Sequence, residues 1–194
     1  MQERALLLRL DRNPGVRDYG SQPERFDFTD AQGRSHTYIP DFIVWRHSGA
    51  TEIHEVTLSA RRLQLNLRRR EEAAQAICDS RGWAYVIHTE HTLPGPTELA
   101  NLLALYLYRP TAYFQDGIRQ AAYERLELFQ FAELRGLAAT IVADLHLSTR
   151  QVLASLCHLL WHGQLNTDLQ TLMFVDGEVV PGTQVWRSLE GEKS

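Results

Sequence analysis

Two acidic residues in the first third of the chain have a spacing that suits neighbouring strands. Asp41 stands in Ile39-Pro40-Asp41-Phe42-Ile43-Val44, and ten residues separate this stretch from Glu55-Val56-Thr57. On adjacent strands the two carboxylates can point into one space, where they repel each other unless a cation lies between them. Mg²⁺ or Mn²⁺ meets that need, since both bind oxygen and are commonly held by one or two carboxylates. The pattern predicts a metal site that activates water and stabilises charge on a phosphodiester; two solvated acids are the alternative.

Strand alternation determines which side chains share a face with these acids. Residues two apart on a strand point to the same side, so Ile53, Glu55 and Thr57 share one face. The residues expected to pack on the opposite, apolar side are Phe42, Val44, Val56 and Leu58.

The first 90 residues read as a mixed sheet with helices on its faces. A short amphipathic helix over 2–10 ends at Asn13-Pro14-Gly15. Strands over 25–29, 37–45 and 51–58, with turns at 30–34 and 46–49, predict an antiparallel meander. The residues after it predict a helix over 60–80, with Leu63 and Leu67 on its apolar side, and a strand over 83–88. Strand, helix and strand in this order add a parallel pair.

The second half is mainly helical. Thr92-Leu93-Pro94-Gly95-Pro96 is a linker, and helices are expected over 98–108, 113–131 and 133–144. A fourth begins at the N-cap Ser148 and runs to Trp161, and residues 173–180 form a hairpin with an Asp-Gly turn. This order is typical of a winged helix. We therefore predict an α/β nuclease-like domain over 1–92 and a helical, winged-helix-like domain over 97–194.

Composition limits the class of protein. The 194 residues are 44% hydrophobic and 23% charged, which excludes a disordered or collagen-like chain. No apolar run approaches the roughly 20 residues that cross a bilayer, and no signal core follows Met1. The two cysteines, Cys78 and Cys157, are too few for a disulfide framework and read as core thiols. We expect a cytoplasmic protein with no membrane partner.

Positive charge is concentrated in one segment. Five arginines, and no acid, lie among residues 61–70: Arg61, Arg62, Arg68, Arg69 and Arg70. This segment is the expected contact for a polyanion, and a solvated helix face is the plainer alternative. The four histidines at 47, 54, 88 and 91 lack paired metal-ligand spacing and are expected to be structural or surface residues.

The ordered set of motifs resembles the PD-(D/E)xK nuclease pattern, in which a helix acid, Pro-Asp on one strand and Glu-x-Lys on the next form the site. Within that superfamily the chain is similar to the TnsA-type endonuclease subunit of heteromeric transposases. The resemblance is carried by Gln22-Pro23, Tyr38-Ile39-Pro40-Asp41-Phe42, Glu55-Val56, Gly82-Trp83 with Thr89-Glu90, and the winged-helix-like segment from Leu159 to Leu169.

The resemblance implies a bacterial subunit that cuts the 5′ (non-transferred) strand at transposon ends with Mg²⁺, or with Mn²⁺ in its place. It implies three partners: transposon-end DNA, a DDE transposase subunit and an AAA+ ATPase regulator. Carried over by position, Glu3 resembles the helix acid and Asp41 and Glu55 the metal ligands, with the Val56 carbonyl as a further ligand. Arg61, Arg62, Arg68 and Arg69 are expected to contact DNA phosphates.

Thr57 departs from the family pattern, which places lysine there. Threonine offers a hydroxyl and no charge, and the chain's one lysine, Lys193, lies at the tail. Arg61 or Arg62 can supply positive charge, but a guanidinium stays protonated and is a poor proton donor or acceptor. An alternative function is therefore a catalytically silent TnsA-like subunit that bridges DNA, transposase and ATPase. The helix after Ser148 carries only Arg150, which favours protein contact over DNA reading in the second half.

Overall fold

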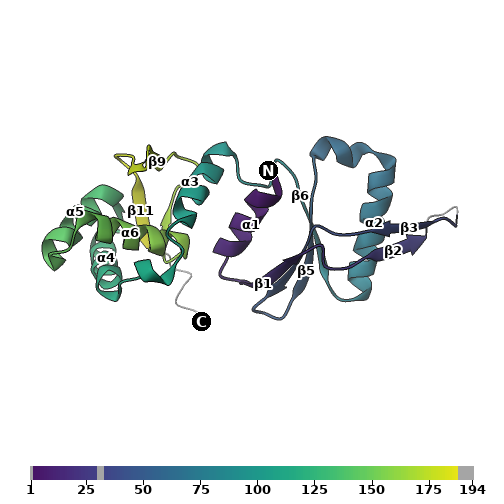
Figure 1. Ribbon diagram of the computed structural model, residues 1–194, viewed down its shortest axis with the longest axis horizontal. Coiled ribbons are helices and arrows are strands. Elements are labelled where there is room, and N and C mark those ends of the chain that lie inside the picture. The colour runs from purple at the N-terminus through teal and green to yellow at the C-terminus, as the bar shows by residue number, and fades with distance from the viewer. Residues whose placement is uncertain (1, 30–32, 188–194) are drawn as a thin grey trace. The chain divides into compact units, whose positions relative to one another are not determined.

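The computed structural model describes residues 2–29 and 33–187, in two compact units. Unit 1 comprises residues 1–94 and unit 2 residues 95–194. Figure 1 shows a sheet with helices in unit 1 and a mainly helical unit 2. No helix among the described residues is both long enough and apolar enough to span a membrane.

Unit 1 is built on a four-stranded mixed sheet. Its strands are β1 (Val16–Ser21), β4 (Phe42–Arg46), β5 (Thr51–Val56) and β6 (Ala84–His88), in the order β1-β4-β5-β6. The β1–β4 and β4–β5 pairs are antiparallel, whereas β5 and β6 are parallel. The crossover between the parallel strands contains a short 3₁₀ helix, η1 (Ser59–Leu63), and α2 (Leu65–Ser80). The predicted parallel pair is confirmed.

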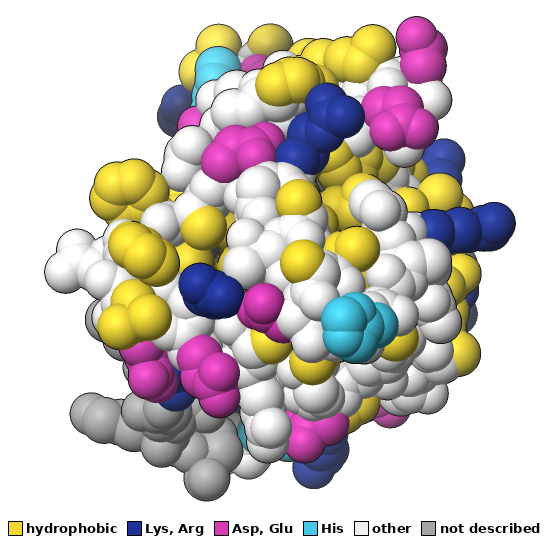
Figure 2. All heavy atoms as spheres, turned by 90° about the vertical axis from the view of Figure 1, so that its left-hand side faces the viewer, with side chains coloured by type: hydrophobic (Ala, Val, Ile, Leu, Met, Phe, Trp, Pro, Cys, Tyr) yellow, Lys and Arg dark blue, Asp and Glu magenta, His cyan; other side chains and the backbone are white. Residues whose placement is uncertain are grey.

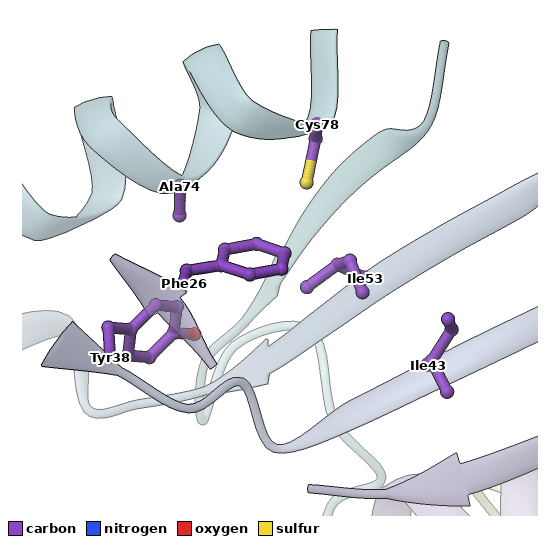
Figure 3. Packing of buried hydrophobic residues seen from close by; sticks show 6 residues of the cluster. All are labelled: Phe26, Tyr38, Ile43, Ile53, Ala74 and Cys78. Atoms are coloured by element: carbon purple, nitrogen blue, oxygen red, sulfur yellow. The ribbon is translucent and has the colours of Figure 1, made fainter. Parts of the chain in front are cut away.

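Each face of this sheet packs on one helix. Helix α1 (Gln2–Arg12) packs Leu6 and Leu10 with Phe42 and Val44 of β4. On the other face, α2 packs against Ile43 of β4 and Ile53 of β5. In Figure 3, Ala74 and Cys78 point from α2 toward a cluster formed by Ile43 and Ile53 of this sheet and by Phe26 and Tyr38, which lie on strands outside it.

The predicted alternation is confirmed for Phe42, Val44 and Val56, which lie on the α1 face. It is wrong for Leu58, which is 42% exposed. Strand β5 ends at Val56, so the alternating pattern has stopped before Leu58. Leu63, expected on the apolar side of the helix, is also exposed, because it lies in η1 ahead of α2.

The predicted meander is wrong in its topology. The expected strand over 37–45 is two strands, β3 (Ser35–Tyr38) and β4, separated by Ile39-Pro40-Asp41. Strand β3 pairs with β2 (Phe26–Thr29) in a separate ribbon, and β1, which was not predicted, takes the place beside β4. Pro40 has no N–H to continue a ladder, which explains the break. The predicted turn at 30–34 lies partly outside the described residues.

Unit 2 contains four α-helices among its described residues: α3 (Pro96–Tyr106), α4 (Asp116–Phe129), α5 (Leu134–Leu145) and α6 (Thr149–Trp161). The short 3₁₀ helix η2 (Thr111–Tyr113) lies between α3 and α4. Ser148 and Gln151 form a capping box, so the predicted N-cap of α6 is confirmed. Helix α6 is buried along most of its length because α3, α4, α5, η2 and β8 all pack on it.

Short strands complete unit 2. The predicted hairpin is β9 (Phe174–Val175) with β10 (Glu178–Val179), turning at Asp176-Gly177. A three-stranded sheet that was not predicted joins β7 (Phe131–Glu133), β11 (Gln184–Arg187) and β8 (Leu165–Thr167), in that order. These strands have three or four residues each, too few for an alternating pattern to show.

Candidate functional site

Unit 1 contains a cleft of about 460 Å³ at the end of β5. Parts of α1, the β3–β4 connection, η1 and α2 contribute residues to it. The predicted site residues that line it are Glu3, Asp41, Glu55, Val56, Thr57 and Arg61. Arg70 of α2 lines it as well. Residues from separate elements, far apart in the sequence, therefore meet in one place.

Asp41 is fixed through its own backbone and through β5. Its carbonyl oxygen accepts a hydrogen bond from the Gln22 backbone N–H at 2.8 Å. Its Oδ2 accepts one from the Val56 backbone N–H at 2.7 Å. The second contact ties the start of β4 to the end of β5, where Glu55 precedes Val56. The pairing of the two acids is thus set by the sheet itself.

Glu55 is the most buried of the acids in the cleft, with only 4% of its surface exposed. Its Oε2 accepts a hydrogen bond from the Tyr38 hydroxyl, and its Oε1 accepts one from Arg70 Nη2 at 2.5 Å. The pKa of Glu55 is raised to about 7: burial and the charge of Asp41 raise it, and these effects are partly offset by the Tyr38 hydrogen bond and the charge of Arg70. A buried carboxylate beside a second one is a site that gains from a cation.

Tyr38 is a hydrogen-bond donor to the site. Its ring packs edge-on against Phe26, with centroids 6.1 Å apart, and its hydroxyl lies 3.5 Å from that of Tyr85. Burial raises the pKa of Tyr38 far above its usual value, so the hydroxyl keeps its proton and continues to donate to Glu55. Tyr38 was not predicted as a site residue, although it stands three positions before Asp41 in the same motif.

Removing this hydroxyl tests its role. In Tyr38→Phe, Glu55 loses a donor that lowers its pKa, so we expect the pKa of Glu55 to rise above about 7 and any activity that needs the carboxylate to shift to higher pH. We also expect a loss of about 1–2 kcal/mol in unfolding free energy. The pH profile of activity and urea unfolding measure the two effects. Tyr85→Phe, which removes the neighbouring hydroxyl that does not reach Glu55, is the control. An unshifted profile would contradict the assignment.

The arginine cluster divides between two clefts. Arg62 forms an ion pair with Glu71 at 3.2 Å and lines a second cleft of about 310 Å³, together with Arg68. Arg62 does not line the cleft of Asp41 and Glu55, which removes one of the two predicted replacements for the missing lysine. Arg61 lines that cleft, but the cation that contacts Glu55 there is Arg70. Arg70 was counted in the cluster and not predicted as a site residue.

Thr57 occupies the position where lysine was expected, and it is almost completely buried. Its backbone N–H donates to the His88 carbonyl oxygen at 2.9 Å, extending the β5–β6 pairing past the end of β5. Thr57 lines the cleft. Thr57 therefore shares the cleft with Asp41 and Glu55 but carries no charge there.

The donor set of the cleft fits a hard divalent cation. Asp41 and Glu55, which both line the cleft, carry carboxylate oxygens, and such cations are commonly bound by one or two carboxylates with waters and phosphate oxygens. Within residues 2–29 and 33–187, no three acidic, imidazole or thiol side chains are grouped to hold a metal. Glu3, in the first turn of α1, is exposed and lies on the cleft wall.

A second polar network lies on the α1 side of the sheet. Glu52 accepts from Arg46 at 2.7 Å and contacts His54 Nε2 at 2.8 Å, and His54 Nδ1 lies 2.9 Å from His88 Nε2. Burial lowers the pKa of His54, and burial together with His54 lowers that of His88 to about 4. Both rings are therefore neutral near pH 7, as expected of structural histidines.

Most of unit 1 is similar to a known protein family. A family model described as "TnsA-like endonuclease N terminal" matches residues 13–90. Residues 13–90 are therefore similar to the N-terminal domain of TnsA-like endonucleases. No curated protein matches the chain. The matched stretch includes β1 to β6 and therefore Asp41, Glu55, Thr57 and Arg70, while Glu3 lies just before the matched residues. The resemblance to a TnsA-type nuclease is confirmed for residues 13–90.

Proposed function

We propose that the protein is the DNA-cleaving subunit of a heteromeric transposase. It would hydrolyse the 5′ (non-transferred) strand at transposon ends with Mg²⁺ or Mn²⁺, in the cytoplasm of a bacterium. The observation that carries the proposal is a cleft, in the part of the chain that resembles TnsA, that is lined by Asp41, Glu55 and Val56. A divalent cation bound there would activate a water molecule and stabilise charge on the phosphodiester.

Different residues of the cleft would bind the cation, neutralise phosphate charge and orient water. Asp41 and Glu55 would hold the cation, with Asp41 oriented by the Val56 N–H and Glu55 by the Tyr38 hydroxyl. The buried position of Glu55 excludes bulk water from one side, which strengthens electrostatic interactions in the cleft. Arg61, which lines the cleft, would neutralise phosphate charge beside Thr57. Glu3, on the wall, would orient a water molecule.

The arginine cluster would hold the DNA backbone. Arg61, Arg68 and Arg69 are exposed along η1 and the first turns of α2, next to the two clefts. A surface of this kind reads phosphate charge rather than base sequence.

We therefore expect the double variant Arg68→Ala/Arg69→Ala to bind duplex DNA about tenfold more weakly at about 0.1 M salt. The plot of log affinity against log salt should become shallower by one to two units, because one to two fewer phosphates are neutralised. Fluorescence anisotropy over a salt series measures both. Arg135→Ala/Arg150→Ala in unit 2 removes the same charge and should leave affinity and slope unchanged. An equal effect of both pairs would refute a DNA surface confined to unit 1.

We propose that unit 2 is a winged helix that contacts protein. Its order of α4, β7, α5, α6, β8 and β11, with the sheet order β7-β11-β8, supports a winged helix. The helix that would read a major groove is α6, but His158 Nδ1 lies 2.8 Å from the Tyr108 carbonyl oxygen and Trp161 packs on Tyr106. In Figure 2 the Lys and Arg side chains are scattered among acidic and apolar ones. The partners would be the DDE transposase subunit and the AAA+ ATPase regulator.

A cleavage assay tests the proposal. The full chain is mixed with its transposase and ATPase partners, end-labelled transposon DNA and Mg²⁺ or Mn²⁺, and the two strands are resolved separately. The expected result is 5′-strand cleavage that is lost in Asp41→Ala. Assembly on the DNA without any cut would overturn the proposal and support the catalytically silent subunit, which Thr57 favours. In that case Thr57→Lys distinguishes a missing ammonium, which restores cleavage, from a site that no longer works.

A further inference from the structure

Arg70 lines the cleft with a guanidinium group whose hydrogen-bonding capacity is only partly used. Its Nη2 donates to Glu55 Oε1 at 2.5 Å, and its guanidinium carbon lies 4.5 Å from the centre of the Tyr38 ring. Its Nε is buried and has no hydrogen-bond partner among the described residues. Arg70 thus makes a one-point contact with a carboxylate, although a guanidinium can make a two-point contact.

Arg70 and a divalent cation would compete for the carboxylate oxygens of Glu55. One of its oxygens accepts from Tyr38 and the other from Arg70, so a metal ion that binds Glu55 must share or replace one of these contacts. Sharing would bring a divalent charge within a few ångströms of a guanidinium, and like charges at that distance in a partly buried site repel strongly. Tyr38, which is neutral and buried among Phe26 and Tyr85, is not affected by that repulsion.

A phosphate group can accept two hydrogen bonds from Arg70, whereas Glu55 accepts one. Its oxygens can accept from Nε and from Nη2 at the same time, which would satisfy the buried Nε. About a third of the side chain is exposed, on the cleft side of α2, so a short movement toward the opening does not break the packing of Ala74 and Cys78. The position of Thr57 in the same cleft leaves room beside it, because threonine is shorter than lysine.

We propose that Arg70 and the divalent cation are alternative partners of Glu55, and that metal binding releases Arg70 to bind the phosphate at the scissile bond. Arg70 then supplies the positive charge that Thr57 lacks. The inference rests on the proposed function, since it takes the Asp41–Glu55 cleft as the metal site. It assigns to α2 a charge that the family pattern places on β5.

Competition for Glu55 has a measurable consequence. In Arg70→Gln the cation no longer has to displace a guanidinium, so we expect Mn²⁺ to bind the full chain about tenfold more tightly than it binds the wild type. Arg70→Met, which keeps the aliphatic stem over Tyr38, should do the same and serves if the glutamine variant fails to fold. Arg70→Lys keeps a cation and should stay within about twofold of the wild type. Arg69→Gln removes an exposed neighbouring charge and is the matched control.

The experiment is a calorimetric titration with Mn²⁺ in mildly alkaline buffer, preceded by thermal unfolding in EDTA to show that each variant is folded. Unchanged or weaker Mn²⁺ binding in both Arg70→Gln and Arg70→Met overturns the inference. Asp41→Asn is titrated alongside. Binding that depends on Asp41 but not on the Arg70 substitutions leaves the proposed function standing and removes only the competition. Binding that does not depend on Asp41, or no binding in any variant, removes the metal site itself and the inference with it.

The cleavage readout separates the two roles of Arg70. If Arg70 only obstructed the metal, its removal would raise activity at low Mn²⁺ and leave it unchanged at saturation. If it also binds the reacting phosphate, Arg70→Gln should cut DNA at least about tenfold more slowly at saturating Mn²⁺, with Arg70→Lys partly active. Wild-type rates in Arg70→Gln at saturation would overturn the phosphate role.

Discussion

Replacing Asp41 by asparagine is expected to abolish DNA cleavage while leaving unit 1 at least as stable as the wild type. The side chain of the Asp41→Asn variant keeps an oxygen that can accept from the Val56 N–H, the 2.7 Å contact that holds β4 to β5. The substitution removes one of the two negative charges that a divalent cation needs. We expect cleavage to fall by at least about a hundredfold and Mn²⁺ affinity to fall with it.

The stability side of this prediction has a definite sign. Asp41 raises the pKa of Glu55, which means that the two carboxylates repel each other in the folded protein. Removing the Asp41 charge relieves that repulsion, so the unfolding free energy at mildly alkaline pH should rise or stay the same. Urea unfolding in EDTA measures it. A variant that loses activity only because it unfolds would instead lose several kcal/mol and show no transition at moderate urea.

Asp27→Asn is a suitable control for this experiment. Asp27 is an exposed acid on β2, in the separate ribbon, and it accepts from the Thr37 hydroxyl at 2.7 Å. Its substitution changes the net charge by the same amount without touching the cleft. Equal losses of cleavage in both variants would point to a general effect of charge on DNA binding rather than to metal ligation by Asp41.

The core of the fold could be predicted because its signals are local. The alternation of Phe42 and Val44 with Ile43 in β4 indicated the two faces of the sheet, and the apolar spacing in α2 indicated its packing on one of them. The position of β1 could not be found in this way. Its residues, Val16–Ser21, do not alternate, and its place depends on pairing with β4, from Ser21 with Phe42 to Val16 with Arg46, well beyond a short window of sequence. Non-local pairing is the information that a short window of sequence lacks.

The candidate site, too, was predicted only where its residues stand in local sequence motifs. Asp41 and Glu55 were predicted from their motifs, whereas Arg70 was one of five similar arginines. Its spacing held a signal that charge counting does not use: positions 70, 74 and 78 recur every four residues, and Ala74 and Cys78 face the sheet. A basic residue on the buried side of a helix must find a partner there, and Glu55 is that partner. Tyr38 needed the structure, because its partner depends on how the β2–β3 ribbon packs.

Replacing Glu55 by glutamine is expected to abolish cleavage and to remove a loss of stability that the wild type shows as pH rises. The pKa of Glu55 is about 7 in the folded protein and about 4.5 when the chain is unfolded, chiefly because of burial. Below about pH 4.5 the carboxyl group is neutral in both states. Between about pH 4.5 and 7 the unfolded state loses its proton first, so this group's contribution to stability is lost as pH rises. The loss is on the order of 3 kcal/mol by about pH 8.

Glu55→Gln does not lose stability through ionisation as pH rises, but the buried glutamine side chain still needs hydrogen-bond partners. Its carbonyl oxygen can accept from Tyr38 or from Arg70, and its amide group faces the other as a second donor. The net gain at about pH 8 is therefore smaller, about 1–2 kcal/mol, while at about pH 5 the variant should be no more stable than the wild type. The stability difference between variant and wild type should grow steadily between these pH values, which is the signature of a buried carboxylate.

Glu52→Gln supplies the matched control from the same strand. Hydrogen bonds and charge from Arg46 and His54 outweigh burial and lower the pKa of Glu52, so its contribution to stability is present above about pH 4.5 and is lost in acid. This variant should lose stability at about pH 8 relative to the wild type, the opposite sign from Glu55→Gln. His88, whose pKa is lowered to about 4, stabilises the fold above about pH 6.5 and less in acid. This contribution cancels between Glu55→Gln and the wild type, whereas Glu52→Gln lowers the pKa of His88 further, because the charge of Glu52 raises it.

Urea unfolding at intervals from about pH 5 to about pH 8, read by pulsed hydrogen exchange in peptides from β4 and β5, confines the measurement to unit 1. Parallel pH curves for Glu55→Gln and the wild type would mean that Glu55 is not a buried, charge-strained carboxylate, and the metal site would lose its strongest physical basis. Divergence in the expected direction, with cleavage lost, would mean that unit 1 gives up stability to keep a carboxylate where a cation can use it.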